Sequence, residues 1–434
     1  MTESVRNFCL FALVALMIVT TGVIQSWNSA LLILNMGLVS AIMSLGLNLQ
    51  WGLAGLFNVG VMGFVALGGL ATVLIAMPAT PTAWGAGGAR IVIALLFASV
   101  VIAAVIGVYK RMPNSTTRFV VMLALLLIGV IIYRAILDPA VATVEAINPA
   151  LAGYIGGLNL PVLVAWPVGG VLAACAAWLI GKTALGLRSD YLAIGTLGIA
   201  EIIIAVLKHE DWLARGVKNV IGIPRPVPYE IDLQQDANFL ARATDLGIDP
   251  TIASSLFVKL NYAILFAVVL LTLFIMAQLA LNSPWGRMMR AIRDNEVTAA
   301  AMGKDVTARH LQVFVLGSAI CGIAGAMMTT LDGQLTPASY QPLRFTFLVW
   351  VMVILGGSGN NLGAVLGGFF IWFFWVQVEP IGLLLIEFAT IGLADESWFK
   401  QHLLASAAYM RLFTMGLILL LVLRFWPRGL IPGR

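Results

Sequence analysis

Few side chains in this sequence could do chemistry, and the clearest of them is a lone carboxylate. Glu201 lies in the stretch LAIGTLGIAEIIIAVL with no charged neighbour. A carboxylate among apolar residues is costly to bury, so it usually serves an ion or substrate pathway, or is protonated or hydrogen-bonded near a helix end. Asn48 and Asn58 are polar groups in or beside other apolar stretches, where hydrogen bonds between helices are their more common role. Glu201, Asn58 and Asn48 are therefore our candidates for a polar pathway, with a structural role as the alternative.

The longest basic and amphipathic segment is 283–310, SPWGRMMRAIRDNEVTAAAMGKDVTARH. Its first part places apolar residues on one helical face, namely Trp285, Met288, Met289 and Ile292. The opposite face carries three basic residues, Arg287, Arg290 and Arg293. Glu296 opens a second short helix with Val297, Ala300 and Ala301 on one face, and Gly303 can adopt the left-handed conformation that ends it. The segment predicts two short helices at an angle, which lie on a membrane surface or are gripped by another protein.

No arrangement of residues indicates catalysis, a metal or a nucleotide. The three cysteines lie within apolar runs, where small buried hydrophobic side chains are expected, and the three histidines are scattered. Gly181, Lys182 and Thr183 resemble the end of a phosphate-binding loop, but Ala176 stands where that loop needs a glycine. We therefore predict no enzyme activity, no catalytic residue, no metal and no cofactor in this chain.

The composition determines the class of protein. Hydrophobic residues make up 61% of the 434 residues, charged residues make up 10%, and the mean hydropathy is +0.99. A soluble domain needs charge on its surface, whereas here apolar runs of about twenty residues, the length that spans a bilayer, follow one another. The chain is predicted to be an all-α, polytopic integral membrane protein in a lipid bilayer. Its net charge of +5 reflects the loops between spans and does not indicate nucleic acid.

The apolar runs predict about 10–12 transmembrane helices in a single domain, 1–434. They are 8–24, 29–49, 52–76, 91–109, 119–137, 160–181, 191–207, 260–281, 311–331, 345–355, 363–378 and 409–423. The first run follows Arg6 and has no clean cleavage site, so we expect a retained anchor instead of a signal peptide. A polar, acidic insert at about 208–259 separates the seventh and eighth runs.

Basic residues fall mainly on one side of these spans. If the chain starts inside the cell, the loops on that side, including 283–310 and the C-terminal tail, carry an excess of arginine and lysine. The insert on the other side is acidic. This bias predicts that both termini and the 283–310 loop are cytoplasmic and that the insert is periplasmic.

A glycine pattern marks the later runs. Gly359, Gly363 and Gly367 recur every four residues, which predicts a smooth helix face for close packing against another span. The stretch GGSGNN at 356–361 is either a cytoplasmic turn or a break in a re-entrant helix.

Several blocks of the sequence resemble one transporter family. AIRDNEVTAAAMGKDV, at 291–306, resembles the Glu-Ala-Ala coupling loop of ABC-importer permeases through Glu296, Ala300 and Gly303. SDYLAIGTLGIAEII, LNLQWGLAGLFNVG, VMVILGGSGNNLGAVLGG and the terminal PRGLIPG are similar to blocks of the branched-chain amino acid (leucine/isoleucine/valine) permease family. The chain departs from the family at RGVKNVIGIP, 215–224, where the family's Thr-Gly-Gly start is missing, which weakens any transfer of a substrate contact there.

The resemblance implies a subunit of a bacterial inner-membrane importer that uses no ATP itself. It also implies its partners, which are a homologous second permease subunit, two cytoplasmic ATPase subunits and a periplasmic substrate-binding protein. In that scheme the 283–310 loop docks in a cleft of an ATPase, and its apolar stripe faces the permease. The ATPase-coupling residues would be Arg287, Arg290, Arg293, Glu296, Ala300 and Gly303.

Two alternatives stay open on the sequence. Urea and short-chain amide permeases resemble this family closely, so urea or an amide is the second choice of substrate. An ion-coupled secondary carrier would also have many spans, an intramembrane acid such as Glu201 and glycine-interrupted helices. Such a carrier needs no docking loop, and no internal repeat in this sequence supports it.

Overall fold

The computed structural model describes residues 3–148, 153–186, 189–391 and 397–433. The first half contains α1 (Glu3–Ile24), α2 (Trp27–Leu47), the π-helical turn η1 (Asn48–Leu53), α3 (Val61–Ala76), α4 (Pro81–Ala83), the π-helical turn η2 (Trp84–Gly88), α5 (Ala89–Arg111), α6 (Thr116–Glu145), α7 (Val162–Ala184) and α8 (Ser189–His209). The insert contains α9 (Asp211–Ala214), the 3-10 turn η3 (Gly216–Lys218), β1 (Val220–Ile221), α10 (Glu230–Gln235) and α11 (Ala237–Asp245). The remaining elements are α12 (Pro250–Asn282), α13 (Pro284–Asp294), α14 (Glu296–Ala301), α15 (Val306–Asp332), β2 (Gln334–Leu335), the 3-10 turn η4 (Pro337–Ser339), α16 (Pro342–Gly356), α17 (Asn361–Ala389), α18 (Trp398–Ser406), the 3-10 turn η5 (Ala407–Tyr409) and α19 (Met410–Phe425).

The predicted all-α, polytopic class is confirmed. Among the described residues, nine helices are long and apolar enough to cross a membrane, or ten if the bent pair of α18 and α19 is one span. Each apolar run overlaps one long apolar helix, but α3 and α16 are only 16 and 15 residues long. These two helices and the 16-residue α19, which belongs to the bent pair, account for the difference between twelve runs and nine full spans.

The third run, 52–76, departs from the expected single helix. Helix α3 starts only at Val61, after the π-helical turn η1 and an unwound segment in which Gly55 has a φ of +70°. The freed backbone groups find partners inside the protein: Leu56 N–H donates to the Gln50 carbonyl, and Val59 N–H donates to the Thr196 hydroxyl. Non-helical backbone at membrane depth is tolerated where protein surrounds it in this way.

Helix α15 lies at the centre of the bundle and packs against α2, α3 and α7. Glycines bring α3 and α15 into backbone contact, since a Cβ at Gly68 would overlap the Gly322 carbonyl and one at Gly325 would overlap the Val65 carbonyl. Lipid gives helices no hydrophobic reason to associate, so such close backbone packing holds the bundle together.

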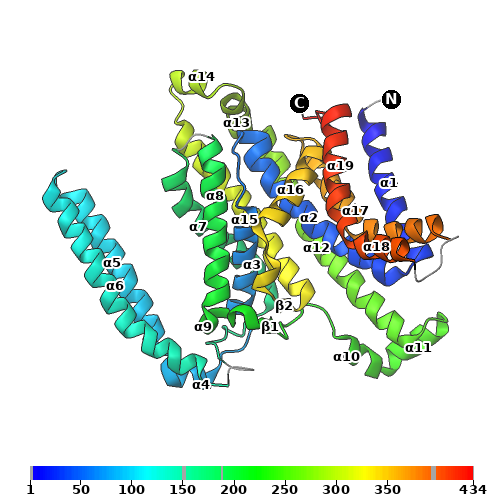
Figure 1. Cartoon of the computed structure of the whole chain (residues 1–434), viewed down its shortest axis with the longest axis horizontal. Helices are drawn as coiled ribbons and strands as arrows, with labels where there is room; N and C mark the ends of the chain where they lie inside the picture. The colour runs from blue at the N-terminus through cyan, green and yellow to red at the C-terminus, as the bar shows by residue number, and fades with distance from the viewer. Residues whose placement is uncertain (1–2, 149–152, 187–188, 392–396, 434) are drawn as a thin grey trace.

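Helices α5 and α6 form a hairpin that stands away from the bundle (Figure 1). The two helices pack on each other, and at one end Glu145 accepts a hydrogen bond from the Trp212 backbone N–H at 3.2 Å. Their outward side chains are apolar and largely exposed, as Leu96, Val100 and Ile131 show at 62%, 64% and 67%. Exposed aliphatic side chains on a membrane hairpin fit contact with lipid.

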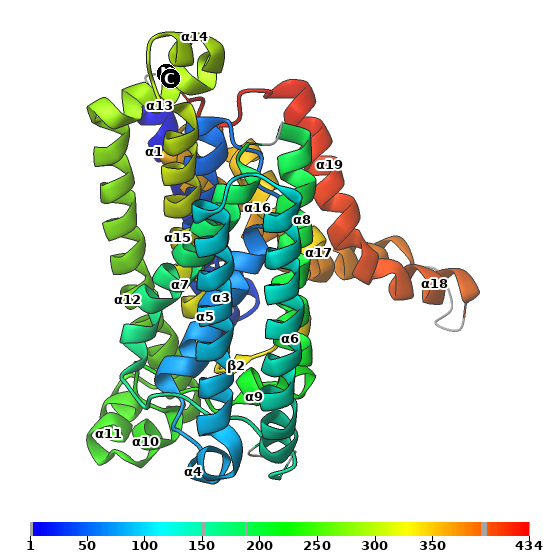
Figure 2. The ribbon, with the colours of Figure 1, turned by 90° about the vertical axis from the view of Figure 1, so that its left-hand side faces the viewer.

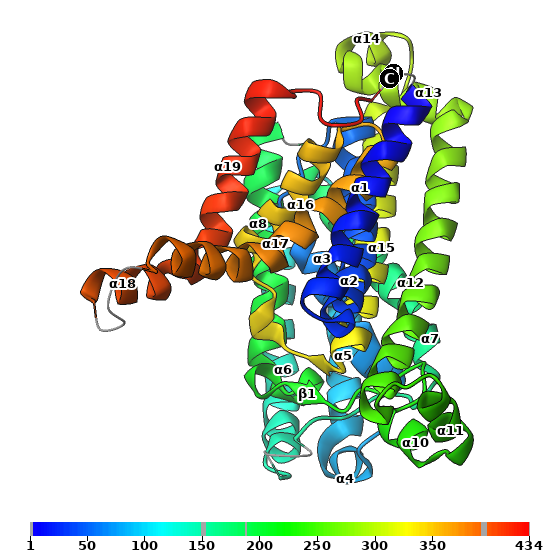
Figure 3. The ribbon, with the colours of Figure 1, turned by 90° about the vertical axis from the view of Figure 1, so that its right-hand side faces the viewer.

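The molecule has two distinct ends, which the side views make clear (Figures 2 and 3). Helices α13 and α14, the first turn of α1 and the segment after α19 lie at one end. The insert, with α10 and α11, lies at the opposite end, where β1 pairs with β2 through Val220 opposite Leu335. We call these the α13–α14 end and the insert end.

Candidate functional site

The two short helices predicted within 283–310 are confirmed as α13 and α14. Each starts at a side-chain cap, because the Ser283 hydroxyl accepts from the Gly286 N–H and the Asn295 side chain accepts from the Thr298 N–H. Gly303 follows α14 with a φ of +76°, the left-handed conformation that glycine favours. These local signals set the bounds of two short helices between two spans.

The two helices expose their apolar residues differently. Helix α13 buries Met289 and Ile292 against the bundle, as its predicted stripe requires. Helix α14 buries Ala299, whereas Val297 is 79% exposed and Ala300 is exposed too. The face of α14 that carries Val297 and Ala300 therefore points away from the helix bundle.

The basic residues of α13 do not share one role. Arg287 is exposed and donates to the Asn282 carbonyl, and Arg290 is half-buried beside a polar cavity. Arg293 turns toward the bundle, where its Nη1 donates to the Gly52 carbonyl at 2.6 Å. Glu296, at the start of α14, is exposed. Arg293 thus links α13 to the π-helical turn η1, an inward contact that differs from the expected outward polar face.

The turn η1 is tied in turn to α15 and to the start of α17. The buried Asn48 amide donates to Asn361 Oδ1 at 3.0 Å, and its carbonyl oxygen accepts from the Gly359 N–H at 2.8 Å. The buried Gln50 amide donates to the Ser318 hydroxyl and to the Phe314 carbonyl. The hydrogen bond from Arg293 to the Gly52 carbonyl therefore connects α13 to η1 and, through η1, to α15 and the start of α17.

Asn58, the other polar candidate of the first half, belongs to the same network. Its side-chain amide donates to Gln50 Oε1 at 2.8 Å, and its oxygen accepts from the Gly60 N–H at 2.8 Å. Asn48 and Asn58 are 0% and 1% exposed, so neither lines an open pathway in this conformation. Their hydrogen bonds join helices and hold the unwound segment in place.

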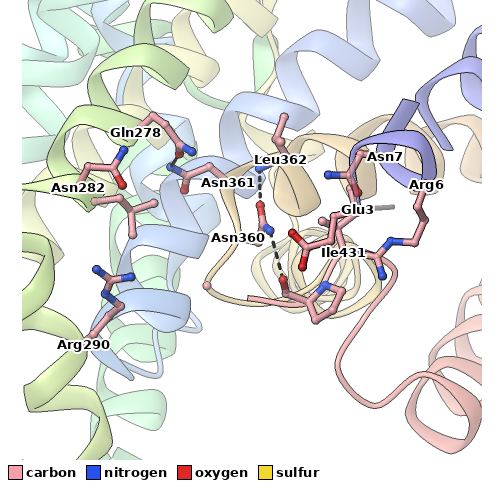
Figure 4. A pocket seen from close by; sticks show the side chains of 13 residues that line it. Glu3, Arg6, Asn7, Gln278, Asn282, Arg290, Asn360, Asn361, Leu362 and Ile431 are labelled. Carbon is pink, nitrogen blue, oxygen red and sulfur yellow. Dashed lines mark hydrogen bonds between the residues drawn. The ribbon is translucent and has the colours of Figure 1, made fainter. Parts of the chain in front are cut away.

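A polar cavity of about 330 Å³ lies at the α13–α14 end (Figure 4). Arg290 enters it from α13, and Glu3 and Arg6 enter it from α1. Asn360 joins the start of α17 to the terminal segment, because its side chain accepts from Leu362 N–H and donates to the Pro432 carbonyl. The cavity brings α1, α13 and the segment after α19 around the start of α17.

The predicted glycine stripe is interrupted. Gly359 lies in the turn before α17 with a φ of +83°, so it is not on the helix face, and a Cβ added there would lie 3.1 Å from Arg293 Nη1. Gly363 and Gly367 do lie on α17 and face α16, where a Cβ at Gly367 would overlap the Met352 carbonyl. The spacing of four residues between these glycines therefore does not show that the first of them lies in a turn and not on the helix.

Glu201 lies inside α8, on the wall of a lateral groove of about 580 Å³. The groove is formed by α8, the start of α16 with the two residues before it, and α19. Its polar lining residues are Glu201, Lys208, Tyr340, Gln341 and Arg344. Its remaining lining residues are Pro342, Leu343, Phe347 and Leu412. Within the described ranges, no group of three or more histidine, cysteine, aspartate or glutamate side chains could hold a metal ion.

Of the residues that line this groove, only Glu201 was predicted from the sequence. Lys208 follows Glu201 by seven residues, two helical turns, so their spacing alone places both on one face of α8. The sequence does not indicate that Arg344 belongs to the groove, because only the packing of α16 against α8 brings Arg344 near Glu201. The Gln50 contacts to α15 are non-local in the same way.

A family model described as "Branched-chain amino acid transport system / permease component" matches residues 119–423. The chain belongs to this family. The matched residues include α13, α14 and the whole lateral groove. Transport permeases of this family are membrane subunits of transport systems, which agrees with the apolar helices described above.

Individual relatives are distant. The high-affinity branched-chain amino acid transport system permease protein LivM of Escherichia coli is 29% identical over 205 residues, 46% of this chain and 47% of that protein. The probable branched-chain amino acid transport permease protein LivM of Methanocaldococcus jannaschii is 28% identical over 295 residues, 68% of this chain and 73% of that protein. The fructose import permease protein FrcC of Rhizobium meliloti is 24% identical over 183 residues, 38% of this chain and 50% of that protein.

The chain spans about half the length, 47%, of the Escherichia coli and Salmonella typhimurium relatives. No solved structure matches it.

Proposed function

We propose that this chain is a membrane permease subunit of an ATP-driven importer for branched-chain amino acids. The observation that carries the proposal is the capped, outward-pointing pair α13–α14 inside the family match. The names of the relatives from Escherichia coli and Methanocaldococcus jannaschii support the substrate class. Glutamate, alanine and glycine at 296, 300 and 303 support a coupling loop.

The proposed assembly has four kinds of component. A homologous second permease subunit would pair with this chain, two ATPase subunits would bind at the α13–α14 end, and an external binding protein would deliver substrate at the insert end. ATP hydrolysis would belong to the ATPase subunits alone. The membrane would be the bacterial inner membrane, with the α13–α14 end and both termini in the cytoplasm, which the excess of basic residues on that side supports.

In the proposed mechanism the ATPase moves α13 and α14 when it binds ATP. The exposed Glu296 and the exposed face of α14 would contact the ATPase, while Met289 and Ile292 anchor α13 in the bundle. Arg293 would pass the movement to Gly52 in η1. ATP then shifts the importer between inward and outward states only because it favours one of them.

Uptake by the complete importer tests this function. Proteoliposomes that contain this chain with its partners should accumulate radiolabelled leucine only when ATP is present, and Glu296→Ala should abolish the accumulation while the protein still inserts in the membrane. The matched control is Glu387→Ala, an exposed carboxylate on α17 away from α14.

Each other outcome changes a specific part of the proposal. Uptake of urea instead of leucine would keep the ATP-driven mechanism and replace the substrate. Uptake of either compound without ATP, driven by an ion gradient, would refute the ABC-importer function and favour a secondary carrier.

A further inference from the structure

The lateral groove between α8, α16 and α19 holds charges that lipid cannot satisfy. Glu201 is exposed inside the α8 span, and in the described part of the chain its carboxylate has neither a hydrogen bond nor an ion pair. Lys208 is half-buried two turns further along the same helix, and its ammonium likewise has no partner there. Charged side chains within spans usually face protein, water or a substrate pathway. This face of the molecule is therefore unsuited to contact with lipid chains.

The opposite wall of the groove supplies a second cation. The Arg344 guanidinium lies over the Trp375 ring at 5.0 Å, and its side chain is exposed to the groove. This cation–π contact orients the guanidinium without neutralising it. Tyr340 beside it is buried and bonded to the Thr329 hydroxyl at 2.9 Å, which fixes the segment that enters α16. Arg344 is thus held in place with its charge still available.

Apolar side chains lie next to these charges. Leu343, Phe347 and Leu412 line the groove and are 67%, 43% and 52% exposed. A groove with one anion, two cations and a short apolar wall matches one kind of small molecule, an α-amino acid with an apolar side chain. A neutral solute such as urea would leave all three charges without partners.

One end of the groove lies toward the insert end of the molecule. Lys208 lies in the last turn of α8, which leads directly into α9 of the insert. Its cationic end therefore faces the insert end of the molecule, which Figure 1 shows opposite to α13 and α14.

We propose that this groove is this chain's half of the substrate site, binding a zwitterionic apolar amino acid with its ammonium on Glu201 and its carboxylate on Lys208 and Arg344. This inference rests on the proposed importer function, and the facing wall would come from the second permease subunit. The substrate side chain lies against Phe347 and Leu412. Transport then requires both charges of the amino acid as well as its apolar side chain.

The test compares charge-neutralised variants in the complete importer. Glu201→Gln and Arg344→Gln should each reduce kcat/KM for ATP-dependent leucine uptake by about tenfold, the value of one lost charge-assisted contact. The matched controls Glu387→Gln and Arg90→Gln remove exposed charges from α17 and α5 outside the groove and should transport leucine normally. Purified complexes of all four variants are checked for assembly and for ATPase activity.

A second measurement detects substrate binding in the groove without removing a charged group from it. The exposed Cys9 and Cys175 are first replaced by serine. In this background Leu412→Cys should react with a membrane-impermeant thiol reagent. Leucine should slow the reaction at least about tenfold, whereas urea should not slow it. Normal leucine uptake by the groove variants, or thiol modification that ignores leucine, would overturn the groove assignment and leave the importer function intact. A wild-type importer that never transports leucine would overturn both.

Discussion

At the scale of single residues, Arg293 is the most direct connection between the α13–α14 pair and the bundle. Its guanidinium donates to the Gly52 carbonyl in η1, and it lies close enough to Gly359 that a Cβ added there would be 3.1 Å from Nη1. A charged donor on a backbone carbonyl in a crowded, partly buried position is stronger than an ordinary neutral hydrogen bond. π-helical turns such as η1 recur at functional sites, which makes Gly52 a reasonable point for movement to enter the bundle.

We therefore expect Arg293→Gln to weaken the coupling between ATP hydrolysis and uptake. A coupling loss of about 1 kcal/mol corresponds to roughly fivefold fewer leucine molecules carried per ATP. The ratio is measured in proteoliposomes from leucine uptake and phosphate release in the same sample. Arg424→Gln, an exposed arginine in the last turn of α19, is the control. An unchanged ratio in Arg293→Gln would show that movement enters the bundle elsewhere.

At the scale of elements, the turn between α16 and α17 is built from backbone packed on backbone. Gly363 and Gly367 on α17 face α16, and the terminal segment joins them when Leu430 N–H donates to the Leu355 carbonyl at 2.8 Å. The sequence block PRGLIPG thus closes the α13–α14 end of these two helices. Contacts this close allow no added side chain without moving a helix.

Gly367→Val should therefore destabilise the protein much more than the same change at Gly416. A Cβ at Gly367 would overlap the Met352 carbonyl, whereas a Cβ at Gly416 in α19 meets no atom within 4 Å. The expected loss for the first variant is about 1–3 kcal/mol or more, typical of overpacking. Thermal unfolding in detergent, followed by the fraction that stays monodisperse, measures it. Equal midpoints for the two variants would contradict the close packing of α16 and α17.

At the scale of the whole molecule, the two ends differ in both shape and charge. The α13–α14 end presents arginines and an exposed helical tip, and the insert end presents α10, α11 and the two-stranded sheet. The polar network of η1 lies toward the first end, and the lateral groove of Glu201 and Lys208 leads to the second. In the proposed importer, the α13–α14 end would receive energy from the ATPase and the insert end would receive substrate.

The sidedness of these ends can be measured with two single cysteines. Val297 and Leu246 are 79% and 74% exposed at the two ends, so their intrinsic reactivities as Val297→Cys and Leu246→Cys should be alike. In intact cells, with Cys9 and Cys175 replaced by serine, a membrane-impermeant reagent should label only Leu246→Cys. Both should react once the membrane is opened. Labelling of Val297→Cys alone in intact cells would reverse the orientation.

The sequence alone determined the class of the protein, the position of nearly every long helix and the two short helices α13 and α14. These are local properties, since apolar length decides a span, and caps, glycine and the helical period decide a short helix. The family resemblance also rests on contiguous blocks of residues, and the match over 119–423 agrees with it.

Only the tertiary structure decided what these elements do to one another. In the tertiary structure the third run is unwound between Gly55 and Gly60, and Gly359 lies in a turn and not on the α17 face. Arg293 contacts the bundle, and Arg344 lies across the groove from Glu201. Each of these depends on a partner from a distant part of the chain. A one-dimensional pattern states which face of a helix is polar, but it carries no information on which neighbour that face will meet.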